Sequence, residues 1–261
     1  MRLLVKLGGT LLESAEALPR VAAELAAVAQ DHAVVVVHGG GKQLSRHLAA
    51  RGIESRFVNG FRVTTPETLQ SVVQVFAGDV NLKLVAALGQ AGARAVGLTG
   101  ADAGLVEATQ LAAELGAVGR IDRVRPELLD SLVAGGYLPV VACLATGRSG
   151  EIYNVNADEM AAACAAAFRA DRLLLLTDVD AVLDANQQPL ARLTAAEAEE
   201  LIRRGVARGG MEAKLRACGR ALAQGVPEVR IAPWARSGVV PQLAAGTGPG
   251  TAILAVRPRG N

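Results

Sequence analysis

The feature that most constrains the fold is a series of short apolar runs that alternate with helix-compatible, often alanine-rich segments. The runs read LLVKL, AVVVVH, RAVGL, YLPVVA, RLLLLTDV, EVRIA and TAILAV. Parallel strands buried on both faces show such continuous runs, and each crossover between them needs a helix. With 261 residues and 51% hydrophobic content, the chain is large enough to fill a sizeable core. The sequence therefore predicts an α/β protein, a three-layer α/β/α sandwich with a mainly parallel open central sheet.

Local signals mark several boundaries of these elements. Thr65, which stands before a proline, predicts a helix N-cap, and Thr194 with Glu197 predicts a capping box. Asn156 is expected to cap another helix, with Glu159 as its capping-box partner.

Glycines and turn residues indicate where elements end. Gly205 and Gly225 are expected to end helices, and residues 146–154 to form a hairpin that turns at Ser149 and Gly150. The pattern weakens between residues 100 and 130, and no element is predicted there.

Composition excludes several classes of protein. The net charge of +2 and the lack of basic runs argue against a nucleic-acid partner. Three scattered cysteines in apolar surroundings, Cys143, Cys164 and Cys218, indicate neither a disulfide framework nor a metal site. The first strand-like run follows Met1 and Arg2 directly, and we find no apolar run of membrane-spanning length. We therefore expect a soluble, cytoplasmic protein without a signal peptide, and no membrane partner.

The most conspicuous local motif is VVVVHGGGKQL, in which a strand leads into Gly39, Gly40 and Gly41. Backbone N–H groups at the start of a helix attract anions, and glycines let an anion approach them closely. Neither the Walker A spelling nor the GxGxxG fingerprint fits, since Gln43 follows the lysine and Leu44 stands where a glycine is needed. A tight strand-to-helix turn remains the alternative interpretation of the triplet.

Two lysines and one carboxylate stand at similar places. Lys6 precedes Gly8 and Gly9 at the exit of the first strand, where a lysine in an apolar run needs a buried partner. Ligands of open α/β sheets bind beyond the carboxyl ends of the strands, so Lys6 is expected to face such a ligand. Lys214 follows the glycine pair of GGMEAK, and Asp158 lies in the first turn after NVN. Alternatively, Lys214 is a solvated helix lysine and Asp158 complements the helix dipole.

Together these motifs resemble the amino acid kinase family, and the resemblance covers nearly the whole chain. The matching segments are KLGG (6–9), HGGGK (38–42), NGFRVT (59–64), GYLPVV (136–141), NVNAD (154–158), TDVDAVLD (177–184), GGMEAK (209–214) and GTAIL (250–254). NGFRVT combined with NVNAD is typical of the branch that phosphorylates N-acetyl-L-glutamate. Aspartate, uridylate and glutamate 5-kinases are expected to differ there. The resemblance implies a carbamate kinase-like fold.

The resemblance also implies the reaction, in which the γ-phosphoryl group of ATP passes to the side-chain carboxylate of N-acetyl-L-glutamate. In it Lys6 and Lys214 stabilise the transition state, with Lys214 nearer the nucleotide, and Asp158 orients both ammonium groups. Phosphoryl transfer between two anions depends on alignment and charge neutralisation. The attacking carboxylate is ionised at neutral pH, so no general base is required. Mg²⁺ is expected to arrive bound to the nucleotide phosphates, without a metal site on the protein.

The acceptor site carried over from the family contains Arg62, which matches the carboxylate-binding arginine, and Asn154, which contacts the polar backbone groups of the substrate. A guanidinium fork suits a carboxylate. The N–H groups of Gly40 and Gly41 are expected to hold the reacting end. Outside this motif Arg62 would be read as a surface arginine, and His38 is expected to be structural.

The C-terminal half is expected to bind ATP. The positions carried over from the family are Gly8, Gly9, Asp178, Val179, Asp180, Ala181, Val182, Leu183, Val206, Ala207 and Arg208. Ala181 departs from the glycine common in relatives, which could reshape the loop beside the adenine. The pair Glu212-Ala213 also replaces the apolar pair usual before the second lysine.

The expected domain organisation is a single amino acid kinase domain over residues 1–261. A lobe of about 1–150 would bind the acceptor and form a homodimer, and a lobe of about 151–261 would bind ATP. Arginine-inhibited relatives carry an additional N-terminal helix, so we expect a homodimer that arginine does not inhibit.

Three other functions stay open. A kinase for an N-blocked α-aminoadipate in a lysine pathway differs by one methylene, which gives only about 1–3 kcal/mol of discrimination. A non-catalytic small-molecule sensor on the same fold should lack one of the two lysines or the aspartate. An unrelated α/β binding protein would use the glycines as turns alone.

Overall fold

The computed structural model describes residues 1–8 and 10–255, and its largest element is an eight-stranded sheet. The strand order is β14-β16-β15-β11-β1-β2-β8-β5. The strands are β1 (Arg2–Leu7), β2 (Ala33–His38), β5 (Ala95–Thr99), β8 (Leu138–Ala142), β11 (Arg172–Thr177), β14 (Arg192–Thr194), β15 (Glu228–Pro233) and β16 (Thr251–Leu254). Neighbours pair in parallel except β15 with β16. The predicted mainly parallel open sheet is confirmed, and β14 is an addition to the predicted strands.

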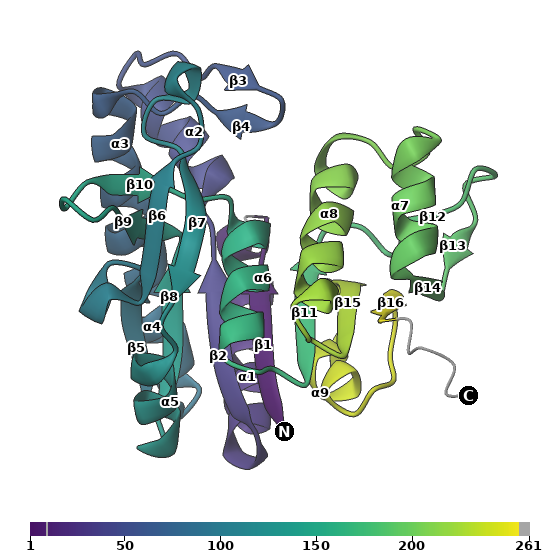
Figure 1. Ribbon diagram of the computed structural model, residues 1–261. Helices are drawn as coiled ribbons and strands as arrows, with labels where there is room; N and C mark the ends of the chain where they lie inside the picture. The colour runs from purple at the N-terminus through teal and green to yellow at the C-terminus, as the bar shows by residue number, and fades with distance from the viewer. Residues whose placement is uncertain (9, 256–261) are drawn as a thin grey trace.

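Helices cover both faces of this sheet (Figure 1). One layer holds α1 (Ala17–Asp31), α4 (Asn81–Gln90) and α9 (Val239–Ala244), packed on Leu3 and Val5 of β1. The other holds α2 (Gly41–Ala50), α3 (Pro66–Val73), α5 (Glu127–Ala134), α6 (Ala157–Ala167), α7 (Ala195–Arg203) and α8 (Gly209–Ala223), with Leu4. Since side chains alternate along a strand, Lys6 faces the layer that contains α6 and α8.

Smaller sheets and short helices complete the fold. A four-stranded sheet has the order β10-β9-β6-β7 and contains β6 (Val106–Gln110), β7 (Gly119–Val124), β9 (Leu144–Thr146) and β10 (Ile152–Asn154). Two hairpins are formed by β3 (Phe57–Val58) with β4 (Phe61–Arg62), and by β12 (Val182–Leu183) with β13 (Pro189–Leu190). The short helical turns are η1 (Leu11–Glu13), η3 (Asp102–Gly104) and η4 (Ala113–Leu115).

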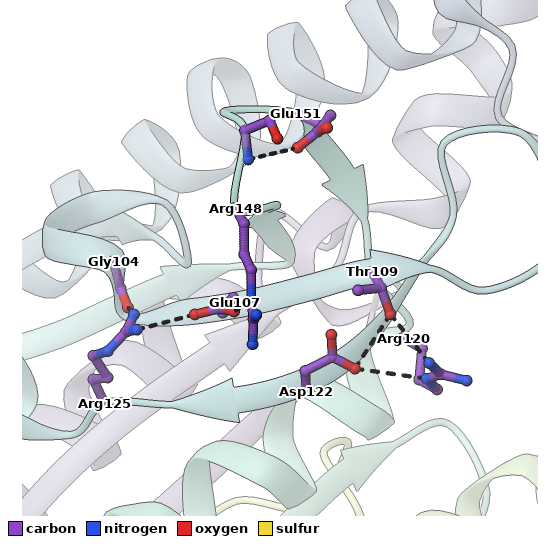
Figure 2. A network of polar contacts seen from close by, with 9 residues as sticks. Gly104, Glu107, Thr109, Arg120, Asp122, Arg125, Arg148 and Glu151 are labelled. Atoms are coloured by element: carbon purple, nitrogen blue, oxygen red, sulfur yellow. Dashed lines mark hydrogen bonds and ion pairs between the residues drawn. The ribbon is translucent and has the colours of Figure 1, made fainter.

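The strands β6 and β7 were not predicted, because one face of their sheet is polar. Figure 2 shows Glu107 of β6 paired with Arg125 and Arg148, at 2.9 and 2.6 Å. Arg120 and Asp122 of β7 form a further ion pair at 3.6 Å. Such a surface interrupts the apolar run by which a buried strand is recognised. The predicted hairpin is confirmed as the antiparallel pair β9 and β10.

The predicted helix boundaries are confirmed with one correction. The Thr65 hydroxyl accepts from a backbone N–H of α3, and Thr194 forms the reciprocal capping box with Glu197. Asn156 caps α6 by accepting from two N–H groups. The role predicted for Glu159 is wrong, because its carboxylate pairs with Arg220 of α8 instead.

Glycines in the left-handed region follow two helices, as expected. Gly205 comes after α7 with φ of 65°, and Gly225 after α8 with φ of 99°.

A continuous helical stretch runs from Pro66 to Gln90, joining α3 and α4 through the π-helix η2 (Gln74–Val80). It has 25 residues, and an 18-residue window within it has a mean hydropathy of 1.4, so it has the length and composition of a membrane span, contrary to our expectation from the sequence. Leu84 and Leu88 of this stretch are buried against the central sheet and α1. The stretch is thus a partly buried core helix.

Candidate active site

The glycine loops lie beside each other at the middle of the sheet. β1 pairs with β2 on one side and with β11 on the other. The chain continues from β1 towards β2 and, later, from β11 towards the opposite edge of the sheet, so the strand order reverses between β1 and β11. Such a switch point forms a crevice at the carboxyl ends of the strands. Gly8 follows β1 and donates its N–H to Leu176 O of β11 at 3.1 Å. Gly9, predicted to bind ATP, lies outside the described residues.

The glycine triplet connects β2 to α2, which begins at Gly41 with Gly40 as its N-cap. A Cβ on Gly40 would lie 2.9 Å from the Phe76 ring and one on Gly39 would lie 3.2 Å from Ala157 Cβ. A Cβ on Gly41 would meet open space. Close packing therefore requires glycine at Gly40, and the triplet is more than a flexible turn.

Lys6 and Lys214 meet at one carboxylate. Lys6 Nζ lies 2.9 Å from Asp158 Oδ1, and Lys214 Nζ lies 3.2 Å from Asp158 Oδ2. Lys6 is 7% exposed and Asp158 is 6% exposed, so the pair is shielded from water. The three residues come from β1, α6 and α8, which places this cluster where the two halves of the chain meet (Figure 1).

The charge of this cluster depends on the balance between burial and pairing. Burial by itself raises the pKa of the Asp158 carboxyl, but the charges and hydrogen bonds of Lys6 and Lys214 outweigh it and lower the pKa below its usual value. Asp158 is therefore ionised at neutral pH. A single carboxylate between two ammonium groups leaves the cluster with a net positive charge, which suits an anionic ligand.

A pocket of about 230 Å³ opens next to this cluster. Its lining brings together the predicted acceptor residues and two of the charged ones: Lys6, Gly40, Gly41, Arg62, Asn154 and Asp158. Phe57, Phe61, Phe76 and Val118 supply apolar walls. The sequence prediction for the acceptor side thus corresponds to one cavity.

Arg62 is held in this pocket by neutral groups. Its guanidinium donates to Ser45 Oγ at 2.7 Å, to Gly41 O at 3.2 Å and to Ser55 Oγ, and lies 4.6 Å from the centre of the Phe57 ring. The residue is 9% exposed. Within residues 1–8 and 10–255 no carboxylate pairs with it. A mostly buried cation without a counter-ion can bind a carboxylate ligand.

Asn154, on β10, also lines the pocket. Its side-chain nitrogen donates to Thr64 Oγ1 at 3.1 Å, and its backbone N–H donates to Ala117 O at 2.9 Å. These bonds fix the direction of the amide group.

The predicted nucleotide residues other than Gly8 and Gly9 are not among the residues that line this pocket, and they belong to the C-terminal half. Asp178 to Leu183 follow β11, and Val206 to Arg208 lead into α8, for which Arg208 is the N-cap. Val182 donates its N–H to Thr251 Oγ1 at 2.9 Å, which anchors the loop after β11. Ala181 does not have a positive φ, so the backbone there does not require the glycine of its relatives.

Several residues around the pocket were missed by sequence reasoning. Ser45 and Ser55 hold Arg62, and Phe76 packs on the glycine triplet from the π-helix η2. Ser45 could have been found, since it lies one turn after Gly41 on the same helix face. Phe76 and Ser55 carry no such local signal.

The remaining candidates are structural, as predicted. Burial lowers the pKa of His38 to about 4, so its imidazole is neutral at physiological pH. All three cysteines are buried, and burial raises the pKa of Cys164 to about 12. They behave as small apolar residues.

Comparison with known proteins agrees with this geometry. The profile described as "Amino acid kinase family" matches residues 1–233. A crystal structure of smu.665 from Streptococcus mutans UA159 superposes with a TM-score of 0.83 at 26% identity, over 97% of this chain and 98% of that one. The chain therefore belongs to the amino acid kinase family.

Within this family the chain is similar to the acetylglutamate kinases. It is 57% identical to that of Solibacter usitatus (strain Ellin6076), over 97% of this chain and 99% of the relative. It is 46% identical to that of Koribacter versatilis (strain Ellin345), over 93% and 94% of the two chains. The branch expected from NGFRVT and NVNAD is confirmed.

Proposed function

We propose that this chain is an acetylglutamate kinase, which transfers the γ-phosphoryl group of ATP to the side-chain carboxylate of N-acetyl-L-glutamate in arginine biosynthesis. The observation that carries the proposal is the pocket in which Arg62, mostly buried and without an ion-pair partner among the described residues, lies together with Lys6 and Gly40. In such a pocket the Arg62 guanidinium can bind the carboxylate of the acceptor that does not react. The Lys6 ammonium group and backbone N–H donors can bind the carboxylate that does. The 57% identity to an acetylglutamate kinase supports the same substrate.

The chemical step joins a carboxylate oxygen to the γ-phosphorus and breaks the bond from that phosphorus to the β,γ-bridging oxygen. The bridging oxygen keeps the electron pair and leaves with ADP, and the product is an acyl phosphate. No proton has to move, because the attacking carboxylate is already ionised. The barrier arises mainly from repulsion between two anions, so positioned cations and N–H donors supply the catalysis.

We assign Lys6, Lys214 and Asp158 to this task. Lys6 lines the acceptor pocket and Lys214 approaches from α8, so the two ammonium groups can contact the transferring group from both sides. Asp158 holds each of them on one of its oxygens, which keeps the like charges at fixed positions. In this assignment Asp158 is a positioning residue, and the lysines are the groups that touch the phosphoryl oxygens.

The acceptor is oriented by Arg62 and Asn154. The guanidinium of Arg62 would bind the α-carboxylate, because its present partners are hydroxyl and carbonyl groups that leave its charge unneutralised. Asn154 would hydrogen-bond to the polar groups next to the α-carbon. The N–H groups of Gly40 and Gly41 would then receive the reacting end.

ATP would bind along the C-terminal half, with Gly8 and Gly9 near its phosphates. Asp178 to Leu183 would lie beside the adenine and ribose, and Val206 to Arg208 would close over them. Among the described residues no group of three or more His, Cys, Asp and Glu side chains is placed to hold a metal ion. Mg²⁺ commonly binds through substrate phosphates with few protein ligands, and we propose that it enters with ATP.

Acyl-phosphate formation trapped with hydroxylamine tests the proposal. N-acetyl-L-glutamate, N-acetyl-L-aminoadipate and free glutamate are compared, with Lys6→Ala as the control for enzyme-dependent turnover. We expect turnover of N-acetyl-L-glutamate that the variant loses. Preference for the aminoadipate compound would place the chain in a lysine-type pathway. No turnover of any acceptor, together with ATP binding, would identify a sensor on the same fold.

The assembly and location of the protein remain part of the proposal. We propose a cytoplasmic homodimer that forms through the N-terminal lobe, about residues 1–150, while the lobe of about 151–261 binds ATP. Sedimentation equilibrium should give twice the chain mass of 26.8 kDa. A hexamer, or inhibition by millimolar arginine, would contradict the expected unregulated dimer.

A further inference from the structure

His38 and Asn81 form a buried pair directly behind the glycine triplet. His38 is fully buried, its Nδ1 lies 2.8 Å from Gly39 O, and its Nε2 lies 2.9 Å from Asn81 Nδ2. The second hydrogen on Asn81 Nδ2 is donated to Val140 O, at 3.0 Å. The reaction proposed above uses neither side chain.

These contacts determine which nitrogen of His38 carries the proton. A carbonyl oxygen only accepts, so the Asn81 atom that faces Val140 O must be the amide nitrogen. That nitrogen only donates, and therefore His38 Nε2 accepts from it. The proton of the neutral ring is then on Nδ1, from which it is donated to Gly39 O. Asn81 thus selects the imidazole tautomer that can hold the Gly39 carbonyl.

Holding this carbonyl also determines the direction of the next N–H group. The Gly39 carbonyl and the Gly40 N–H belong to one peptide unit, and no described peptide bond is cis. In a planar trans peptide the C=O and N–H bonds point in opposite directions. With Gly39 O directed to the His38 ring, the Gly40 N–H points away from that ring, and Gly40 itself lines the pocket. Within the described chain this N–H has no acceptor.

The π-helix η2 explains how Asn81 reaches this position. Asn81 donates its backbone N–H to Phe76 O, five residues earlier, so the two residues lie above each other. An α-helix would turn residues five apart to different faces, because neighbours on one face are three and four apart. The π-helix therefore lets Phe76 pack on Gly40 while Asn81 binds His38. π-bulges are frequent at functional sites, and here the bulge has a definite effect on the loop.

We propose that Asn81 and His38 are positioning residues, which aim the Gly40 N–H at the reacting end, where the acceptor carboxylate meets the transferring phosphoryl group. This inference rests on the proposed function and deepens it. Because an N–H donor directed at developing charge acts mainly in the transition state, loss of the pair should lower kcat more than it raises KM. Gly97 leaves space for the Asn81 side chain, since a Cβ there would lie 2.1 Å from Asn81 Oδ1.

The test compares Asn81→Ala and Gly97→Ala with the wild type. Asn81→Ala removes the amide that donates to His38 Nε2 and so selects the tautomer of the ring. Gly97→Ala displaces the Asn81 side chain, although Gly97 itself does not line the pocket. We expect kcat to fall by about 10- to 100-fold, while the KM values for ATP and the acceptor stay within about 3-fold of the wild type. The expected loss is smaller than for complete removal of an oxyanion donor, which lowers kcat by about 100- to 1000-fold. Ser71→Ala, which removes a buried hydroxyl from α3 in the same helical stretch, should keep kcat.

Two binding and spectroscopic measurements separate this role from a general loss of structure. Affinity for MgADP with aluminium fluoride and N-acetyl-L-glutamate, a mimic of the transferring group, should fall about 10-fold or more in Asn81→Ala. Affinities for ADP and the acceptor alone should be retained. In the wild type, ¹⁵N spectra of the three histidines, assigned with His32→Gln and His47→Gln, should show His38 protonated on Nδ1.

The possible failures are distinguishable. A wild type that phosphorylates none of the acceptors would overturn the proposed function, whatever the variants do. A wild type that is active, with unchanged kcat in both variants or with His38 protonated on Nε2, would overturn the positioning role alone. A rise in KM for the acceptor at constant kcat would also overturn the positioning role, because it would indicate that the pair contributes to binding of the acceptor in the ground state.

Discussion

Lys6 Nζ lies 2.9 Å from Asp158 Oδ1, although β1 and α6 are separated by more than half of the chain. The contact forms because Lys6 and Leu4 share the face of β1 that α6 covers. It joins the first glycine loop to the helix that also receives Lys214, and it places a protein cation at the wall of the acceptor pocket. The predictions below test what this arrangement and its surroundings do.

Replacing the shared carboxylate should affect both activity and stability. Asp158→Asn keeps the shape of the side chain but leaves two mostly buried ammonium groups without a counter-ion. We expect kcat/KM to fall by at least about 100-fold and the free energy of unfolding by about 3–5 kcal/mol. Hydroxylamine trapping and urea unfolding measure the two effects.

A matched control is Asp130→Asn, which breaks the ion pair of Asp130 with Arg2. That pair is exposed, since the Asp130 and Arg2 side chains are 47% and 38% accessible. Its loss should lower the free energy of unfolding by less than about 1 kcal/mol. Near-normal turnover by Asp158→Asn would contradict the role assigned to the carboxylate.

The guanidinium of Arg62 should not be replaceable by an ammonium group. Arg62→Lys keeps the charge but loses the planar fork that is held by Ser45 and Ser55. We expect KM for N-acetyl-L-glutamate to rise at least about 10-fold, with KM for ATP little changed. Steady-state kinetics with each substrate varied in turn gives both constants. Arg56→Lys, in the same segment, should behave like the wild type, and equal effects of both changes would argue against a specific carboxylate site.

Space at the second glycine of the triplet should limit activity. A Cβ on Gly40 would lie 2.9 Å from the Phe76 ring, so Gly40→Ala must displace the ring or the loop. We expect a drop in kcat of about 100-fold, comparable to the loss of an oxyanion donor. Adding Phe76→Leu makes room and should restore part of the activity. If the double variant were no more active than the single one, crowding by Phe76 would not be the cause.

Stability should depend on pH through His38. Its pKa is lowered by burial to about 4 in the folded protein, from an ordinary value of 6.5. Between these values the unfolded chain binds a proton that the folded chain does not, so stability is present above pH 6.5 and is lost as the pH falls. The loss is about 1.4 kcal/mol per pH unit and up to about 3 kcal/mol in total.

Urea unfolding from pH 7 to pH 4 measures this effect. The free energy of unfolding should fall less steeply in His38→Asn than in the wild type, while Ser71→Ala, which removes no titratable group, should keep the wild-type slope. Parallel curves for wild type and His38→Asn would show that folding does not lower the pKa of His38.

Much of the fold could be predicted because its signals are local. The strands β2, β8 and β11 contain uninterrupted apolar runs, and the caps at Thr65 and Thr194 lie within four residues of the groups that they bind. β6 and β7 could not be predicted, since ion pairs such as Glu107 with Arg125 cover one face of their sheet. The role of Glu159 was mispredicted because Arg220, a partner distant in sequence, competes for its carboxylate.

The sequence by itself determined most strands of the central sheet, the glycine loops and the residue types of the site, because periodicity, capping and turn chemistry act over a few neighbouring residues. Only the tertiary structure decided that β1 lies between β2 and β11, which brings Gly8 beside the triplet and turns Lys6 towards Asp158. It also decided that Asn81 reaches His38 through a π-helix. Strand order and the face on which a side chain lies follow from long-range packing of the whole core, which no short segment of the chain encodes.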